Sequence, residues 1–320
     1  MRDKYNVNSI SFNLPAVKVI IKTWYITSIS LSHILACSLA AVFLYFACFF
    51  LVSQAFAPVI EGTGAKVNDD YVDKFGTKKI YPTAENGREW YVNNGNPEAD
   101  KLFDLGGATI ESRGDSSWRI GSDDIEDGFN GQYHIIMSVN SPEGVEEWKN
   151  VEITGYVNVR ETDDDSDSLQ WYARGGRHGD DVPCEGTSLK GRLHADGRAG
   201  WIKEIWHDGG YTEENGTMTI THPITDRWVG WKVVMFNINN DSAVVMESYL
   251  DDNNDNNWKK VSDFVDNGGW YASATDEEFH HIECGKAKDY VITNSGPIVS
   301  FRSDGMVWDF KNLSVREIQP

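Results

Sequence analysis

Basic, aromatic and histidine side chains gather in one stretch of the chain, Gln170 to Asp208. This stretch reads QWYARGGRHGDDVPCEGTSLKGRLHADGRAGWIKEIWHD and holds six basic and six acidic residues, three histidines and three tryptophans. The whole protein carries a formal net charge of -20, so a neutral stretch differs from its background. Arginine forms bidentate bonds to carboxylates and sulfates, and histidine transfers protons near neutral pH. The stretch therefore predicts a binding site for an anionic ligand.

The same stretch has the pattern of three short strands joined by two turns. Side chains alternate between the two faces of a strand, so each strand would present one polar row. Neighbouring strands lie about 4.8 Å apart, which brings such rows within reach of one sugar ring. The predicted rows are Tyr172 with Arg174, Lys190 with Arg192 and His194, and Lys203 with His207, the last with Glu204 and Trp206 on the opposite face.

These rows predict a groove for an anionic glycan, in which flat aromatic side chains stack on sugar rings. A solvated outer face with ion pairs such as Lys203–Glu204 and Arg174–Asp180 is the alternative interpretation. The predicted substrate-binding residues are Gln170, Lys190, Arg192, His194, Lys203, Trp206 and Tyr211.

The residue types in the groove also suit β-elimination on a uronic acid. That reaction needs a cation to neutralise the carboxylate, a base to remove the C5 proton and an acid to protonate the leaving oxygen. Histidines are the candidate bases, arginines the carboxylate binders and a tyrosine the acid. Glycoside hydrolysis is disfavoured because no E-x-D-x-E run lies on a strand-like segment. The predicted catalytic residues are Tyr172, Arg174, Arg177, His178 and His207.

The rest of the exported chain has strand patterns and no amphipathic helix of twelve residues or more. Val151 to Arg160 alternates apolar and polar residues, and Trp228 to Asn239 is a long β-branched and aromatic run. Turns rich in glycine, asparagine and aspartate separate many such short runs. We therefore expect an all-β sandwich or jelly roll over residues 74–320.

Several segments resemble known sandwich proteins. The closing stretch from Val307 to Ile318 is similar to the last strand of concanavalin A-like proteins. The segments WYARGGRH, CEGTSLKGRL, KEIWH and WVGWKVVMFN are similar to a group of secreted archaeal and bacterial proteins, and more distantly to jelly-roll polysaccharide lyases of the alginate and glucuronan type. The resemblance implies a concanavalin A-like fold. The alginate-lyase signatures R-[ST]-E-L-R and Q-[IV]-H are absent, so that family's catalytic residues are not carried over.

The N-terminus has the features of an export signal. Ile34 to Val52 is 19 residues without a formal charge, basic residues precede it, and Ala55-Phe56-Ala57 offers a cleavage site. We expect a signal peptide at residues 1–57 and a linker at 58–73, with an uncleaved membrane anchor as the alternative. Either places the remainder outside the cytoplasm, secreted or on the cell surface. The acidic charge argues against nucleic acid and anionic membrane surfaces as partners.

Two cysteines lie outside the leader, Cys184 and Cys284. In an oxidising compartment they most simply form one disulfide. A Cys/His metal site with neighbouring histidines is the alternative, although no CxxC or HxxxH spacing supports it.

A third feature is an Asp/Asn run that matches the start of a calcium loop. Asp251, Asn253 and Asp255 have the D-x-[DN]-x-[DN] spacing, so a structural calcium ion is the cofactor to expect. Asn256 and Ser262 replace the usual glycine and glutamate, which favours a simple hairpin turn.

The sequence thus predicts an extracellular protein that recognises a polysaccharide. Polysaccharide lyase activity is its enzymatic version. The alternative is a non-catalytic cell-surface structural or adhesion protein without a glycan site.

Overall fold

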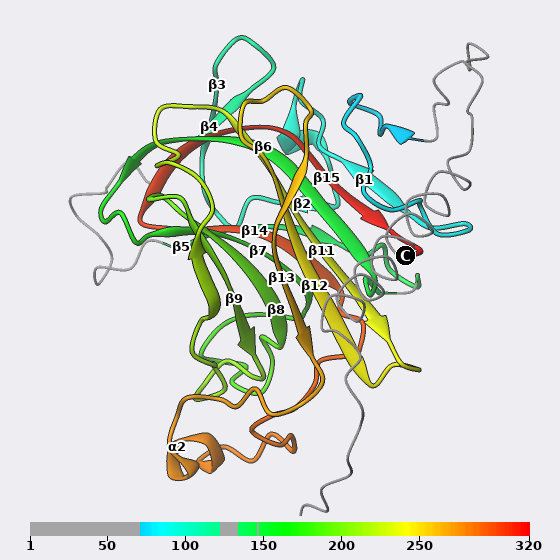
Figure 1. Cartoon of the computed structure of the whole chain (residues 1–320), viewed down its shortest axis with the longest axis vertical. Helices are drawn as coiled ribbons and strands as arrows, with labels where there is room; N and C mark the ends of the chain where they lie inside the picture. The colour runs from blue at the N-terminus through cyan, green and yellow to red at the C-terminus, as the bar shows by residue number, and fades with distance from the viewer. Residues whose placement is uncertain (1–70, 122–133, 146) are drawn as a thin grey trace, which may run out of the picture. The chain divides into compact units, whose positions relative to one another are not determined.

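The computed structural model describes residues 71–121, 134–145 and 147–320 (Figure 1). The predicted signal peptide or anchor at residues 1–57, and residues 58–70 of the predicted linker, lie outside the described residues. Within the described ranges, no helix is long and apolar enough to span a bilayer.

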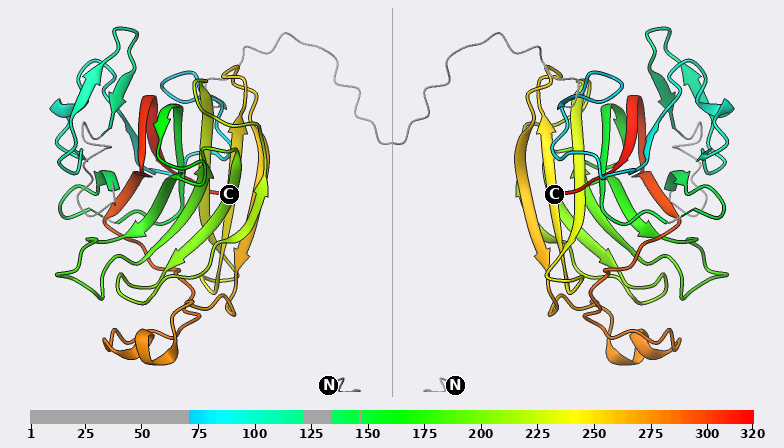
Figure 2. Two further views of the ribbon diagram at one scale, coloured as in Figure 1. Left: turned by 90° about the vertical axis from the view of Figure 1, so that its left-hand side faces the viewer. Right: turned by 90° about the vertical axis from the view of Figure 1, so that its right-hand side faces the viewer.

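Within the described residues, two antiparallel sheets pack face to face (Figure 2). Sheet I has the strand order β13-β12-β11-β6-β15-β4-β3, with β1 also paired to β15, and sheet II has the order β10-β9-β8-β7-β14-β5-β2. The strands of sheet I are β1 (Glu89–Tyr91), β3 (Ile110–Ser112), β4 (Trp118–Ile120), β6 (Val151–Thr162), β11 (Val229–Ile238), β12 (Ala243–Asp251), β13 (Lys259–Asp266) and β15 (Met306–Glu317). Those of sheet II are β2 (Phe103–Asp104), β5 (His134–Asn140), β7 (Ser168–Gly175), β8 (Ser188–His194), β9 (Arg198–Glu204), β10 (Asn215–Thr219) and β14 (Ile298–Asp304).

The core lies between the two sheets and follows from the period-two pattern. On β7, Leu169, Trp171 and Ala173 point inward and are fully buried. The Trp171 ring lies 4.7 Å from that of Trp231 on β11, between ring centroids, and contacts Phe301 edge-on. The Trp171–Trp231 contact joins the two sheets and confirms the predicted all-β sandwich.

The outer face of sheet I is not exposed to solvent as the alternating pattern of β6 would suggest, but is covered by another part of the chain. Glu152 and Asn158 occupy polar positions of the alternating pattern in β6, and such positions normally face solvent, yet both are buried. Lys232 and Arg316 form ion pairs with the Glu152 carboxylate at 2.8 and 2.7 Å. The backbone N–H of Ile80 also donates to it, so the segment before β1 lies over this face. A buried charge is tolerated here because it is paired and hydrogen-bonded.

Long connections at one end of the sandwich are joined by the predicted disulfide. Cys184 and Cys284 are bonded, with Cα atoms 5.2 Å apart, so these thiols are not metal ligands. The bond links the β7–β8 loop to the segment between β13 and β14. That segment carries the α-helix α2 (Asp276–His280), which Thr275 and Glu278 cap reciprocally and which lies beyond the strand ends (Figure 1). A 3₁₀ turn, η2 (Pro97–Ala99), precedes β2.

Candidate functional site

A row of polar side chains crosses the face of sheet II that points away from sheet I. Gln170 on β7 pairs directly with Arg192 on β8 and with Arg302 on β14. Direct cross-strand partners lie on the same face, so the three side chains form one continuous row. The row lines a cleft of about 590 Å³, whose lining residues are His134, Ile136, Gln170, His178, Asp180, Arg192, Ile202, His207, Tyr211 and Arg302.

A second row forms the buried floor beside this cleft. Tyr172 pairs with Lys190, whose ammonium lies over the rings of Tyr172 and Tyr211 at 5.0 and 4.9 Å from their centroids. The same ammonium lies 2.5 Å from Glu204 Oε2. Burial raises the pKa of Tyr172 to about 12 and lowers that of Lys190. The floor is therefore a charged pair held between aromatic rings, out of contact with water.

Glu204 is the centre of the network at the end of β9. Two histidine nitrogens converge on its Oε1: His178 Nδ1 at 3.2 Å and His207 Nδ1 at 3.3 Å. Ser188 donates to Oε2 at 3.2 Å. Burial alone would raise the pKa of Glu204, but the Lys190 charge and the histidine contacts lower it to about 2. The carboxylate is thus ionised, and four groups hold it in place.

The two histidines differ in their surroundings. Burial lowers the pKa of His178 to about 4, while the hydrogen bond to Glu204 raises the pKa of His207. His207 Nε2 lies 3.2 Å from Asp180 Oδ1. His178 Nε2 lies 3.4 Å from the hydroxyl of Tyr211, whose pKa is raised by burial and by the Glu204 charge. Tyr211 therefore keeps its proton and faces a neutral imidazole.

Carboxylates position the two arginines of the row. Arg302 donates to Asp304 at 2.7 Å, and Gln170 donates to the second Asp304 oxygen at 2.5 Å. Burial alone would lower the pKa of Arg302, but Asp304 raises it. Arg192 donates to Glu214 at 2.6 Å. Each guanidinium has five N–H groups, so such partners fix its orientation and leave donors for a ligand.

Of the residues predicted from the sequence, seven come together in or directly beneath the cleft. Five others do not line it, namely Arg174, Arg177, His194, Lys203 and Trp206. The seven are Gln170, Tyr172, His178, Lys190, Arg192, His207 and Tyr211.

Arg174, predicted to bind a carboxylate, lies outside the cleft. Its backbone is left-handed, with φ 68°, and the pairing of β7 with β14 is irregular at this point. The alternation of side chains is broken there. The guanidinium donates to Asn237 of sheet I at 2.5 Å and to the Ile292 carbonyl at 2.7 Å. Burial lowers the pKa of Arg174 to about 10, and its role is to tie the two sheets together.

Lys203 lies on the opposite face of its strand from the one that the sequence predicts. It pairs with Leu189, so its side chain points into the core and forms a fully buried ion pair with Asp266 of β13 at 2.9 Å. Glu204, predicted to lie opposite the site, is the residue that faces it. Trp206 is also buried, with its ring centroid 4.0 Å from that of Phe279 in α2.

The remaining two residues bond elsewhere. Arg177 is 66% exposed and pairs with Glu185 in the β7–β8 loop through two bonds. His194 is buried beside the cleft, where its ring bonds Glu214 and the Ser166 carbonyl. It supports the carboxylate that positions Arg192.

The Asp/Asn run after β12 forms the hairpin turn that its departures from the calcium pattern favoured. The Asp251 carboxylate is fully buried and accepts from the backbone N–H groups of Asp255 and Asn256 at 3.0 and 2.7 Å. Asn254 and Asn256 have positive φ. The Asp251 oxygens predicted to bind calcium thus stabilise the turn itself.

Sequence reasoning did not predict Glu204, Arg302 or Asp304 as site residues. Glu204 precedes His207 by three residues, a spacing visible in KEIWH. Arg302 comes from a strand more than a hundred residues further along the chain, and only the pairing of β7 with β14 brings it to Gln170.

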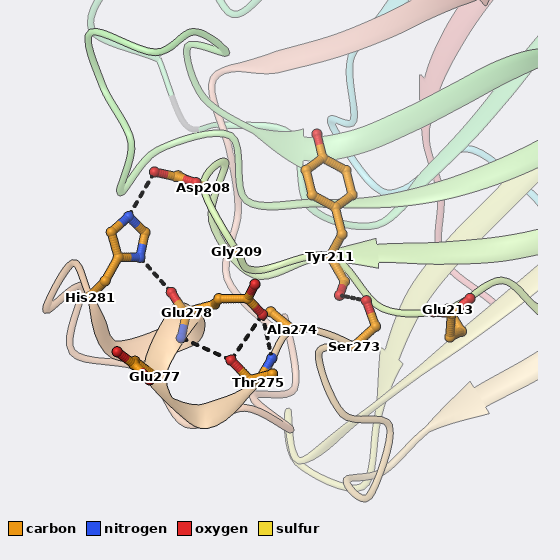
Figure 3. Close-up of a pocket in the computed structure, with 10 residues that line it drawn as sticks. All are labelled: Asp208, Gly209, Tyr211, Glu213, Ser273, Ala274, Thr275, Glu277, Glu278 and His281. Carbon is orange, nitrogen blue, oxygen red and sulfur yellow. Dashed lines mark hydrogen bonds and ion pairs between the residues drawn. The ribbon is translucent and has the colours of Figure 1, made fainter.

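A larger hollow of about 850 Å³ lies on the other side of Tyr211, toward α2 (Figure 3). Four carboxylates line it: Asp208, Glu213, Glu277 and Glu278. The Tyr211 hydroxyl points away from α2 in this view. An acidic lining repels an anionic ligand, so the cleft over sheet II is the better candidate for one.

No protein-family model matches the chain, and no curated protein sequence is similar to it. Solved structures with a similar strand arrangement include peanut lectin with a nine-residue peptide (7% identity, TM-score 0.39, covering 74% of this chain and 100% of that one). Two others are the exoplasmic/lumenal domain of VIP36 in its Ca²⁺/Man3GlcNAc-bound form (12%, 0.40, 68% and 85%) and lectin II from Ulex europaeus (6%, 0.41, 72% and 97%). At these values the likeness concerns the β-sandwich and carries no argument about a ligand.

Proposed function

We propose that the protein recognises a carbohydrate chain bearing acidic groups, in the cleft over sheet II. One observation carries the proposal: Arg192, Gln170 and Arg302 stand in register on three adjacent strands. At about 4.8 Å between strands, the row spans about 10 Å and offers a planar fork at each end. The row can contact two acidic groups of one glycan chain, and the central amide suits a hydroxyl.

The charges around the row favour a ligand with a few well-placed acidic groups over a nucleic acid. The chain has a net charge of -20, so a polyanion is repelled from most of its surface. In the cleft, each arginine is paired with one carboxylate and keeps further N–H donors. Such a site selects ligands that place a few acidic groups correctly, which a phosphate backbone bound through many lysines does not require.

A catalytic version of this function is β-elimination, which the position of Tyr211 favours. Its hydroxyl projects into the cleft 3.4 Å from His178 Nε2, where a proton can pass between them. In the reaction, a base removes the C5 proton of a uronate, the electron pair forms the C4–C5 double bond, and the C4–O bond breaks. The leaving oxygen then takes a proton from an acid such as the tyrosine hydroxyl.

Binding is tested by retention of the protein on immobilised polyuronates, sulfated chains and neutral chains, with and without calcium. Arg302→Met should weaken retention on acidic chains by about 10- to 100-fold, the usual effect of losing a charge-assisted bond. Arg113→Met is the matched control, because that exposed side chain lies in the β3–β4 turn. Equal retention of acidic and neutral chains would overturn the proposal. No retention at all would favour a structural or adhesion role.

Elimination is measured as an increase in the ultraviolet absorbance of the unsaturated uronate product. Tyr211→Phe should abolish a signal that the wild type gives, while Tyr271→Phe, at an exposed tyrosine outside the cleft, should leave it unchanged. Retention without absorbance would identify a binding protein and remove the catalytic version.

A further inference from the structure

We propose that His178, Glu204 and His207 form a binding site for a divalent transition-metal ion of the zinc type. One ligand atom of each residue lies within 4.8 Å of the other two. We assign these atoms as His178 Nδ1, Glu204 Oε1 and His207 Nδ1. Zinc binds imidazole nitrogen at about 2.0–2.1 Å and carboxylate oxygen at about 2.0–2.2 Å, so neighbouring ligands of a tetrahedral site lie roughly 3.3–3.5 Å apart. The two nitrogens lie 3.2 and 3.3 Å from the carboxylate oxygen, close to that spacing.

The second nitrogen of each histidine ring has a hydrogen-bond partner, as is usual for a metal-bound histidine. A metal-bound histidine normally donates its other N–H to a carboxylate, carbonyl or hydroxyl oxygen, which fixes the ring. His207 Nε2 faces Asp180 Oδ1 at 3.2 Å, and His178 Nε2 faces the Tyr211 hydroxyl at 3.4 Å. Both Nδ1 atoms are thereby turned toward Glu204, where an ion would bind.

The carboxylate is held to offer one oxygen. Lys190 and Ser188 occupy Glu204 Oε2, at 2.5 and 3.2 Å, which leaves Oε1 for the ion. Glu204 has no exposed surface, whereas the His178 and His207 side chains are 15% and 20% exposed and line the cleft. The site is thus closed from below and open toward the cleft, so a fourth position remains for water or a ligand oxygen, as in catalytic zinc sites.

Two histidines and one carboxylate select the class of ion. Calcium and magnesium prefer oxygen ligands, and imidazole suits zinc, copper, iron and nickel. The network also has a metal-free explanation, in which a doubly protonated His207 bridges Glu204 and Asp180. The two explanations differ in a measurable way, because the second provides no stoichiometric affinity for zinc.

The test uses the chelator-treated full-length protein in two titrations. Zn²⁺ binding is measured by calorimetry, and Co²⁺ binding is measured by the visible d–d absorption of the bound ion. We expect one ion per chain and the spectrum of four-coordinate cobalt. His207→Ala should lower zinc affinity by at least about 100-fold, and Asp180→Ala, which alters only an exposed residue, by about 10- to 100-fold. His281→Ala is the control, since that exposed histidine pairs with Asp208 outside the cluster.

A wild type that binds no zinc, or a His207→Ala protein that binds it equally well, would overturn the proposal. If His207→Ala does not fold, the comparison of Asp180→Ala with His281→Ala still tests the site, because only Asp180→Ala should weaken zinc binding. Zinc binding is a property beyond glycan recognition, and it is measured without any sugar. Zinc binding without glycan retention would leave the metal site standing and remove only the proposed function.

Discussion

The Lys190 ammonium lies 2.5 Å from Glu204 Oε2, on the outer face of a sheet, and both side chains are almost completely shielded from water. An outer strand face normally exposes such residues. Here the β7–β8 loop and Tyr211 cover them, so the pair is held in a low-dielectric environment where its attraction is strong. The pair fixes the carboxylate to which both cleft histidines bond, and links stability to the geometry of the site.

Removing one member of this pair should destabilise the fold. Lys190→Met leaves the Glu204 charge buried without its main partner, which typically costs about 3–5 kcal/mol. In urea denaturation at pH 7, Lys190→Met and Glu204→Gln should each lower the free energy of unfolding. The Lys190→Met/Glu204→Gln protein should lose clearly less than the sum of the two. Additive losses would mean that the two groups are not coupled.

Lys203 is predicted from the sequence as a binding residue, but its position in the core indicates a role in stability alone. Lys203→Met should reduce the free energy of unfolding by about 3–5 kcal/mol by leaving Asp266 as an unpaired buried charge. The folded variant should bind acidic chains as tightly as the wild type, as measured by retention below its unfolding transition. If Lys203→Met bound acidic chains more weakly but was as stable as the wild type, Lys203 would be a binding residue of the cleft after all.

These residues show how far the sequence determines the site. Period two identified β7 and β8 correctly, because Leu169, Trp171 and Leu193 mark the buried face without ambiguity. On β9, period two places Lys203 on the same face as the buried Trp201, but a lysine is normally exposed, which favoured the outer face. The pairing of Lys203 with Leu189 shows that it faces the core.

Two further features could not be read from local sequence. Arg174 leaves its expected face because of a left-handed backbone that no residue type at that position signals. Arg302 reaches the site by pairing of β14 with β7, a long-range contact. Local patterns thus predicted the strands and the sandwich, whereas strand register and loop cover determine the composition of the cleft.

Acid should destabilise the outer face of sheet I through Glu152. Burial alone would raise the pKa of this carboxyl. The charges of Lys232 and Arg316 outweigh that effect and hold the pKa below its ordinary value of 4.5. A carboxyl with a lowered pKa in the folded state contributes stability above its unfolded pKa, and the contribution is lost as pH falls through the folded value. Unfolding free energies measured in urea should therefore decrease as pH falls below 4.5.

A matched pair of variants isolates this effect. Glu152→Gln should be less stable at pH 7 and should show a weaker decrease below pH 4.5 than the wild type. Glu283→Gln, at an exposed position, should follow the wild-type profile. Parallel profiles for all three proteins would show that Glu152 does not contribute to acid sensitivity.

The disulfide should matter for both stability and the cleft. Cys184 and Cys284 are separated by 100 residues, and closing a loop of this length is worth about 4–5 kcal/mol in the chain-entropy model. Cys184→Ser/Cys284→Ser should unfold at lower urea concentration, and should bind acidic chains more weakly because the loop with His178 is less constrained. Reduction of the wild type should reproduce both effects, and an unchanged urea midpoint would contradict the first.

Gly186 offers a test of the histidine cluster that removes none of its groups. Its φ is 79°, and a Cβ added there would lie 2.8 Å from Glu204 Oε1 and 3.3 Å from His178 Nδ1. Glu204 cannot retreat, because Lys190 and Ser188 hold its other oxygen. Gly186→Ala should therefore displace the carboxylate and lower Zn²⁺ affinity by at least about 10-fold, as perturbing a metal site's support does.

The control for this substitution is Gly269→Ala. Gly269 has the same φ of 79°, and its added Cβ would meet no atom within 4 Å. Both variants share the cost of an alanine in left-handed backbone, about 1–2 kcal/mol, so their urea midpoints measure that cost and their zinc titrations measure the contact. Equal zinc affinity in the two variants would mean that ion binding does not depend on the position of Glu204 Oε1, and would remove that atom from the ligand set.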